Sequence, residues 1–108
     1  MAHPIQSISE TLTAGASGDF GAFDVRDYDS ISVLGTIPSG GLNLSFQVQL
    51  LDGTWIVPFT GSGPFFTGGP GLIPTQTFST PYSSCRIEYS VGGSDTTISF
   101  SVWGTKTS

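Results

Sequence analysis

Three carboxylates lie within six residues, at Asp24, Asp27 and Asp29, and form the densest charge in the sequence. Carboxylate oxygens are ligands that Ca²⁺ prefers, so this segment is a candidate calcium site. Its spacing differs from that of an EF-hand loop, which needs a central glycine and a terminal glutamate. The alternative is a solvated turn in which Arg26 offsets its acidic neighbours. We favour the turn, and we expect no metal and no cofactor.

Few residues of the sequence could serve as a catalytic nucleophile or as its base. Cys85 is the single cysteine and His3 is the single histidine. A nucleophilic Cys or Ser needs a positioned base, and His3 lies in a predicted N-terminal arm, residues 1–4. The acidic residues could in principle supply a glycosidase pair, but most of them fall in predicted turns. We therefore expect Cys85 to be a buried structural residue and the protein not to be an enzyme.

The composition favours one domain with an unusual surface. The chain has 108 residues, which suits a single domain, residues 1–108. Only 10% of the residues are charged, whereas 16 Ser, 13 Thr and 15 Gly are present. The net charge is −5, and nucleic-acid binding needs a basic footprint, so that function is not expected.

Localisation is inferred from what the sequence lacks and from its surface. We find no apolar segment behind a basic start and no run of about 20 apolar residues, so neither a secretory signal nor a membrane span is expected. A surface rich in hydroxyls and poor in charges is commoner outside cells. A virion assembled in the host cytoplasm reconciles these two observations.

The clearest structural signal is a hairpin over residues 42–59. Apolar residues from Leu42 to Leu50 alternate with Asn, Ser and Gln, as in a half-buried strand. Asp52-Gly53 follows and is typical of a type I′ turn, which needs positive φ at both central residues. Alternation resumes at Trp55 and is expected to continue to Phe59.

Similar alternation predicts about eight antiparallel strands and no helix, which indicates an all-β fold. One apolar face per strand favours two packed sheets, and we predict a β-sandwich of jelly-roll type. Phe20 lies out of phase with Phe23, which indicates a bulge or a glycine kink at Gly21. The predicted strands cover residues 5–12, 19–25, 30–37, 42–51, 54–59, 75–80, 85–91 and 98–103.

Residues 60–74 are rich in Gly and Pro and also carry four large apolar side chains. They are predicted to form a long loop. Two interpretations stay open: the apolar groups dock on a neighbouring protein, or they fold back and cap the sandwich. Trp103 falls on the polar side of the last strand, where it is either a further exposed contact residue or a tryptophan covered by a loop. The candidate partner-binding residues are Phe65, Phe66, Leu72, Ile73 and Trp103.

Three short motifs lie at residues 25–33, 52–55 and 82–87. They read Val-Arg-Asp-Tyr-Asp-Ser-Ile-Ser-Val, Asp-Gly-Thr-Trp and Tyr-Ser-Ser-Cys-Arg-Ile. Through these motifs the chain resembles small β-sandwich structural proteins of tailed bacteriophages, and the resemblance covers residues 10–103. The resemblance implies a virion component, such as a capsid decoration (cement) protein, a head fibre or an accessory tail protein. It implies no catalytic residues.

The leading hypothesis is a non-enzymatic decoration protein that binds the major capsid protein or another virion protein. Strand addition along the edge at residues 5–12 and the arm before it, residues 1–4, is a secondary way to dock. The alternative is a carbohydrate-binding module for host attachment, in which Trp103 or Tyr28 stacks on a sugar while Asp27 and Asp29 bind hydroxyls or Ca²⁺. A third hypothesis is a homo-oligomeric fibre or tail subunit.

Overall fold

The computed structural model describes residues 2–56, 64–79 and 84–106, and within them alternating sequence forms nine strands. All strand pairs are antiparallel. The strands are β1 Ala2–Leu12, β2 Ser17–Asp24, β3 Ser30–Ser39, β4 Leu42–Gln49, β5 Trp55–Ile56, β6 Phe66–Gly68, β7 Gly71–Ser79, β8 Ser84–Val91 and β9 Thr96–Thr105.

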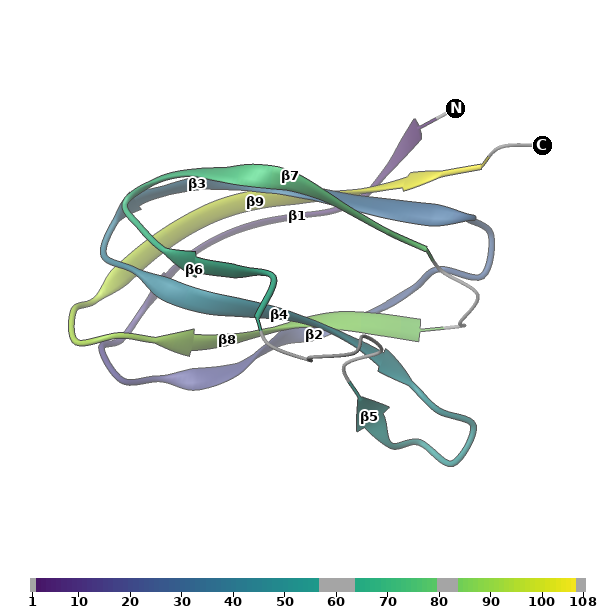
Figure 1. The fold of residues 1–108 in the computed structure, drawn as a ribbon, viewed down its shortest axis with the longest axis horizontal. Coiled ribbons are helices and arrows are strands. Elements are labelled where there is room, and N and C mark those ends of the chain that lie inside the picture. Colours follow the sequence, from purple (N-terminus) through teal and green to yellow (C-terminus); the bar gives the residue numbers. More distant parts are fainter. Residues whose placement is uncertain (1, 57–63, 80–83, 107–108) are drawn as a thin grey trace.

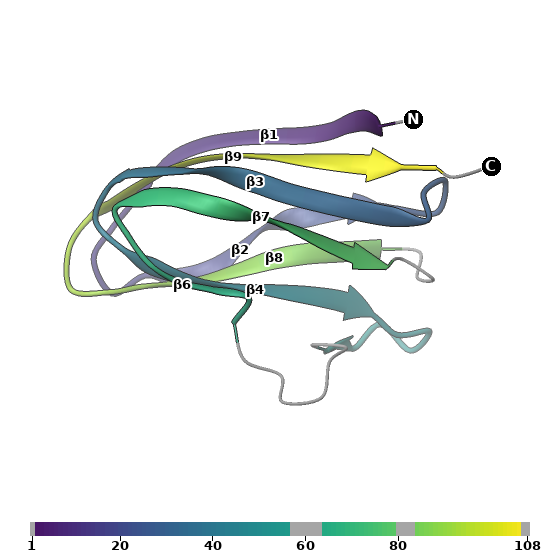
Figure 2. The same cartoon turned by 45° about the horizontal axis from the view of Figure 1, so that its top comes forward.

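The strands form two sheets that pack face to face (Figures 1 and 2). Sheet A has the order β1-β9-β3-β7, and sheet B has the order β2-β8-β4-β5, with β6 also paired to β4. Successive long strands alternate between the two sheets, which gives a jelly roll. The predicted β-sandwich is confirmed. The strand beyond the predicted eight is β6.

The core lies between the sheets because the apolar phase of each strand points inward. Phe46 on β4 stacks against Phe78 on β7, with ring centroids 4.2 Å apart, and so joins sheet B to sheet A. The bulge predicted near Gly21 is present as a register shift between Asp19 and Ala22. It lets Phe20 pack on the core beside Phe100, with centroids 5.0 Å apart.

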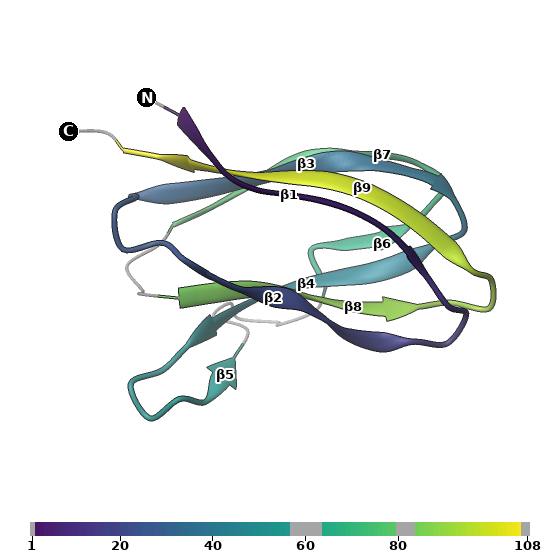
Figure 3. The ribbon, with the colours of Figure 1, turned by 180° about the vertical axis from the view of Figure 1, so that it is seen from behind.

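Two predicted boundaries are wrong. Residues 2–4 are not an arm, because Ala2, His3 and Pro4 pair with Thr105, Gly104 and Trp103 of β9 and so extend β1 (Figure 3). Residues 60–74 are not one long loop either. Of the described part, residues 66–68 form β6 and residues 71–74 begin β7.

The physical reason for the second error lies in the glycines. Gly68, Gly69 and Gly71 have φ values of 135°, 125° and 138°, which side-chain-bearing residues rarely adopt. They let the chain turn sharply between β6 and β7, so the Gly/Pro-rich composition marks a tight turn between two strands. Residues 60–63 of the predicted loop lie outside the described residues, as does the expected continuation of β5 through residues 57–59.

The hairpin turn also differs from the prediction. Leu50 N–H donates to the carbonyl of Thr54 at 2.8 Å, and Gly53 N–H donates to the carbonyl of Leu50 at 2.9 Å. Gly53 has φ 91°, but no non-glycine residue among those described has positive φ. The turn is therefore a three-residue loop ending in a left-handed glycine, and not a type I′ turn.

Candidate functional site

The acidic segment forms a solvated turn. Asp24 accepts hydrogen bonds from the Arg26 side chain, the shortest at 2.6 Å, and from the Arg26 backbone N–H at 2.9 Å. These bonds hold the pKa of Asp24 below its usual value. Among the described residues, no group of three His, Cys, Asp or Glu side chains could hold a metal ion. The structure therefore gives the calcium interpretation no support.

Cys85 lies on β8 with its side chain fully buried in the core. Burial raises the pKa of its thiol from 9.0 to about 12, because the charged thiolate would lose its hydration. A thiol in this environment is a structural residue and a poor nucleophile.

The Cys85 thiol is expected to resist a thiol reagent at pH 8 in the native protein and to react within minutes in urea. Since the folded-state pKa is raised, the unfolded chain loses this proton first. The free energy of unfolding should therefore fall as the pH rises from about 9 towards 12. Because the chain has one cysteine, the absorbance of the chromophore that the thiol reagent releases measures the reaction of Cys85 alone. Rapid native labelling at pH 8 would contradict the burial.

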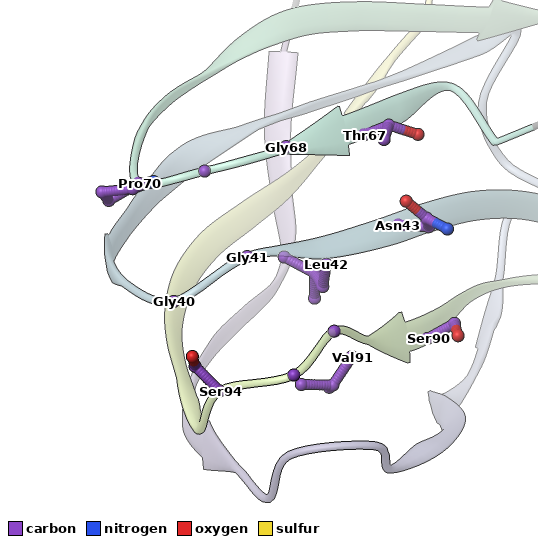
Figure 4. A pocket seen from close by; sticks show the side chains of 13 residues that line it. Gly40, Gly41, Leu42, Asn43, Thr67, Gly68, Pro70, Ser90, Val91 and Ser94 are labelled. Atoms are coloured by element: carbon purple, nitrogen blue, oxygen red, sulfur yellow. The ribbon is translucent and has the colours of Figure 1, made fainter.

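A depression of about 540 Å³ lies at the end of the sandwich where the β3–β4, β6–β7 and β8–β9 connections meet (Figure 4). Six of its 13 lining residues are glycine, and small polar groups come from Asn43, Thr67, Ser90 and Ser94. Next to it, the buried Thr96 hydroxyl lies 3.0 Å from both the N–H and the carbonyl oxygen of Gly41. This arrangement fastens the β8–β9 loop to the β3–β4 turn. None of the lining residues is ionisable.

The five predicted contact residues do not form one surface. Ile73 is 2% exposed and belongs to the core. Phe65 and Phe66 are half-buried and pack on the core, and the Phe65 ring meets Phe78 edge-on at 5.3 Å. For these three residues the structure follows the interpretation in which the segment folds back. Leu72, 77% exposed, and the half-buried Trp103 remain accessible.

Leu72 and Trp103 belong to the outward side of sheet A. There, strand register brings hydroxyl-bearing residues into rows: Ser101 lies beside Ser7 and Leu34, and Ser99 lies beside Ser9 and Thr36. We call this surface the hydroxyl face. Its residues are Ser7, Ser9, Thr11, Ser32, Leu34, Thr36, Leu72, Thr77, Thr97, Ser99, Ser101 and Trp103.

The hydroxyl face carries no charged side chain. The four strands of sheet A contain one charged residue, Glu10, and it has the phase of the inward residues Ile8 and Leu12. The outward side of sheet B differs, because Arg86 there contacts Asp19 at 3.4 Å and lies 4.4 Å from the Trp55 ring centroid. The sequence alone shows that the strands of sheet A are poor in charged residues. Only the strand register shows that the residues of the hydroxyl face lie on the same side of the sheet.

The tip of the β4–β5 hairpin is an exposed apolar surface. Leu51 is fully exposed, and Leu50 and Ile56 are 40% and 37% exposed. We call these three residues the hairpin tip. Figures 1 and 3 show that the hairpin stands away from the body of the sandwich. Sequence analysis assigned Leu50 to the buried phase because its alternation continues that of β4, whereas pairing in β4 ends at Gln49.

The edges of sheet A are poorly suited to strand addition. On β1, Pro4 lacks an N–H donor, and Glu10 places a charge on the inward phase at the edge. On β7, Pro74 likewise lacks a donor. Proline and inward-pointing charge are the devices by which sheets avoid pairing with another chain. The structure therefore disfavours the docking by strand addition that was considered for residues 5–12 and the arm before them.

Tyr28 and Asp27 line a small depression of about 220 Å³ together with His3 and Lys106. The Tyr28 ring lies against Gly104, and its centroid is 6.3 Å from that of His3. Trp103 is not part of this depression. The residues proposed for sugar binding are thus only partly brought together.

The described part of the chain contains no helix that could span a membrane. The fold and surfaces define a jelly-roll β-sandwich with two candidate contact surfaces, the uncharged hydroxyl face and the apolar hairpin tip. Comparisons with protein-family models, curated proteins and solved structures find no match.

Proposed function

We propose that this chain is a non-enzymatic structural protein of a virion, a capsid decoration protein that binds the outer surface of the major capsid protein or another virion protein. The observation that carries this proposal is the hairpin tip, where Leu51 is fully exposed on a hairpin that stands away from the fold (Figure 1). The jelly roll, which recurs in viral capsid proteins, and the charge-poor surface also support it. Because one fold serves many functions, the proposal depends on the surface and not on the fold alone.

The tip has the features of an interface anchor. Burying an exposed leucine contributes roughly 1.5–3 kcal/mol. Leu50 and Ile56 are exposed on the same hairpin and add apolar surface to that of Leu51. Asp52 follows Leu51, and its carboxylate accepts a hydrogen bond from Thr54 N–H at 2.9 Å, which lowers its pKa. The turn is therefore fixed before binding, which lowers the conformational cost of docking.

Substitution of Leu51 by serine is expected to weaken binding to particles that lack this protein by about 10- to 100-fold, because one buried leucine side chain is lost. The free energy of unfolding should change by less than about 0.5 kcal/mol, since the side chain is exposed in the free protein. Particle occupancy against protein concentration, measured by co-sedimentation, gives the affinity.

Leu72→Ser is the matched control, because it makes the same change at another exposed leucine, on sheet A. Leu72→Ser should leave the affinity of a single chain for the particle unchanged, compared at a concentration at which the wild type and the variant have the same oligomeric state. Docking through the hairpin tip would be contradicted if Leu72→Ser weakened particle binding and Leu51→Ser left it unchanged.

A carbohydrate-binding module is the second candidate, favoured by the shared depression of Asp27 and Tyr28. Exposed carboxylates and an aromatic ring are groups that bind sugar hydroxyls and sugar faces. This candidate predicts glycan binding that is lost on Asp27→Ala. If the wild-type protein binds no glycan in a broad panel, the carbohydrate-binding function is rejected.

A further inference from the structure

We infer that the hydroxyl face is the contact surface between two copies of this chain, which pack sheet A against sheet A about a two-fold axis. Trp103, Leu34 and Leu72 supply the apolar part of this contact, and rows of serine and threonine surround them. This inference concerns a surface other than the hairpin tip and does not depend on the proposed function.

The first argument is charge. Each chain has a net charge of −5, so two copies repel unless they meet where carboxylates are absent. The hydroxyl face satisfies this condition, because the single charged residue in the strands of sheet A, Glu10, is not on the outward phase. On the outward side of sheet B, a second copy would bring Asp19 and Glu88 towards like charges.

The second argument is the cost of removing the face from water. Burying a hydroxyl is costly unless it has a hydrogen-bond partner. Here neighbouring hydroxyls already pair across strands, Ser32 with Thr77 at 3.0 Å and Thr11 with Thr97 at 3.3 Å. These four side chains therefore lose fewer hydrogen bonds when water is removed than isolated hydroxyls would.

The third argument is area. The strands of sheet A contain 11, 10, 10 and 9 residues. With strands about 4.8 Å apart and about 3.4 Å per residue, four strands of about ten residues cover roughly 650 Å². Two copies would together bury roughly 1,300 Å², which lies within the range of about 1,200–2,000 Å² for stable interfaces.

The contact also leaves the hairpin tip free. The tip belongs to sheet B, on the other side of the sandwich from the hydroxyl face (Figure 2). A two-fold contact uses the same surface on both copies, so it closes on itself and does not extend into a fibre. The expected species is therefore a dimer with two uncovered tips.

Sedimentation equilibrium tests this inference on the whole chain. At about 10 µM the wild-type protein is expected to have twice the chain mass of 11.3 kDa. Ser99 is an exposed residue of β9, an inner strand of sheet A, so Ser99→Glu places a carboxylate on the hydroxyl face. This substitution should raise the dimer dissociation constant at least about 100-fold, because the two added carboxylates repel each other and lose hydration. Ser90→Glu adds the same charge on the outward side of sheet B and should leave the dimer intact.

Leu34→Ser provides a second variant on the face, with no added charge, should Ser99→Glu fail to fold. It should weaken the dimer by about 10-fold or more. A wild-type chain that sediments at 11.3 kDa up to about 1 mM would overturn the inference. A dimer weakened equally by Ser90→Glu, or abolished by Leu51→Ser, would overturn it as well.

Discussion

Replacing Phe46 with alanine is expected to lower the free energy of unfolding by about 3–5 kcal/mol. Phe46 is 1% exposed, and its ring stacks on Phe78 with an interplanar angle of 4°. The two rings join the sheets across the core, so truncation removes buried area and leaves a cavity between β4 and β7. Urea unfolding followed by circular dichroism gives the free energy from the midpoint and slope.

Leu51→Ala is the control for Phe46→Ala, because it removes an apolar side chain of similar chemistry from full exposure. Its effect should stay within about 0.5 kcal/mol. A loss of less than about 1 kcal/mol for Phe46→Ala would mean that the two sheets do not pack through this pair.

Substituting Gly35 by alanine is expected to cost about 3 kcal/mol, which is large for one added methyl group. A Cβ atom at Gly35 would lie within 2.6 Å of the Cα and Cβ atoms of Phe100 on the adjacent strand β9. Backbone cannot move aside as a flexible side chain can, so β3 and β9 would have to separate in the middle of sheet A. Thermal and urea unfolding measure the loss.

Gly93→Ala is the matched glycine control. No heavy atom lies within 4 Å of a Cβ built at Gly93, and its φ is not positive. Its effect should be within about 0.5 kcal/mol. Equal stability of Gly35→Ala and Gly93→Ala would contradict the pairing of β3 with β9.

The strands were predictable where one face of the strand is buried and the other is exposed to solvent. In β4, β8 and β9 the apolar phase of the sequence is the buried phase, as at Leu44, Ile87 and Ile98, all fully buried. The bulge at Gly21 was also predictable, because Phe20 and Phe23 could reach the core together only if the phase shifted.

The predictions failed where glycine and proline have two possible meanings. In residues 66–74 they form a tight turn between strands, and the apolar side chains Phe66 and Ile73 face inward, whereas the same composition also suits a long docking loop. Nothing local distinguishes these cases, since the difference lies in pairing with β4 and β3, far away in the sequence.

The candidate surfaces depended on long-range register. Leu72 and Trp103 were identified from the sequence as contact candidates, and the register places both on the hydroxyl face. Leu34 was not identified, because a single exposed leucine next to the buried Val33 has no local signature. The hairpin tip was missed because the alternation of β4 runs into the turn, which hides the position where pairing ends.

The most direct test of the proposed function is cryo-electron microscopy of virus particles that lack this protein, incubated with the purified chain. We predict ordered density on the outer shell, with the β4–β5 hairpin at the contact and Leu51 buried against the capsid protein. Absence of added density at saturating protein, or density in which the hairpin points into solvent, would contradict attachment through the tip.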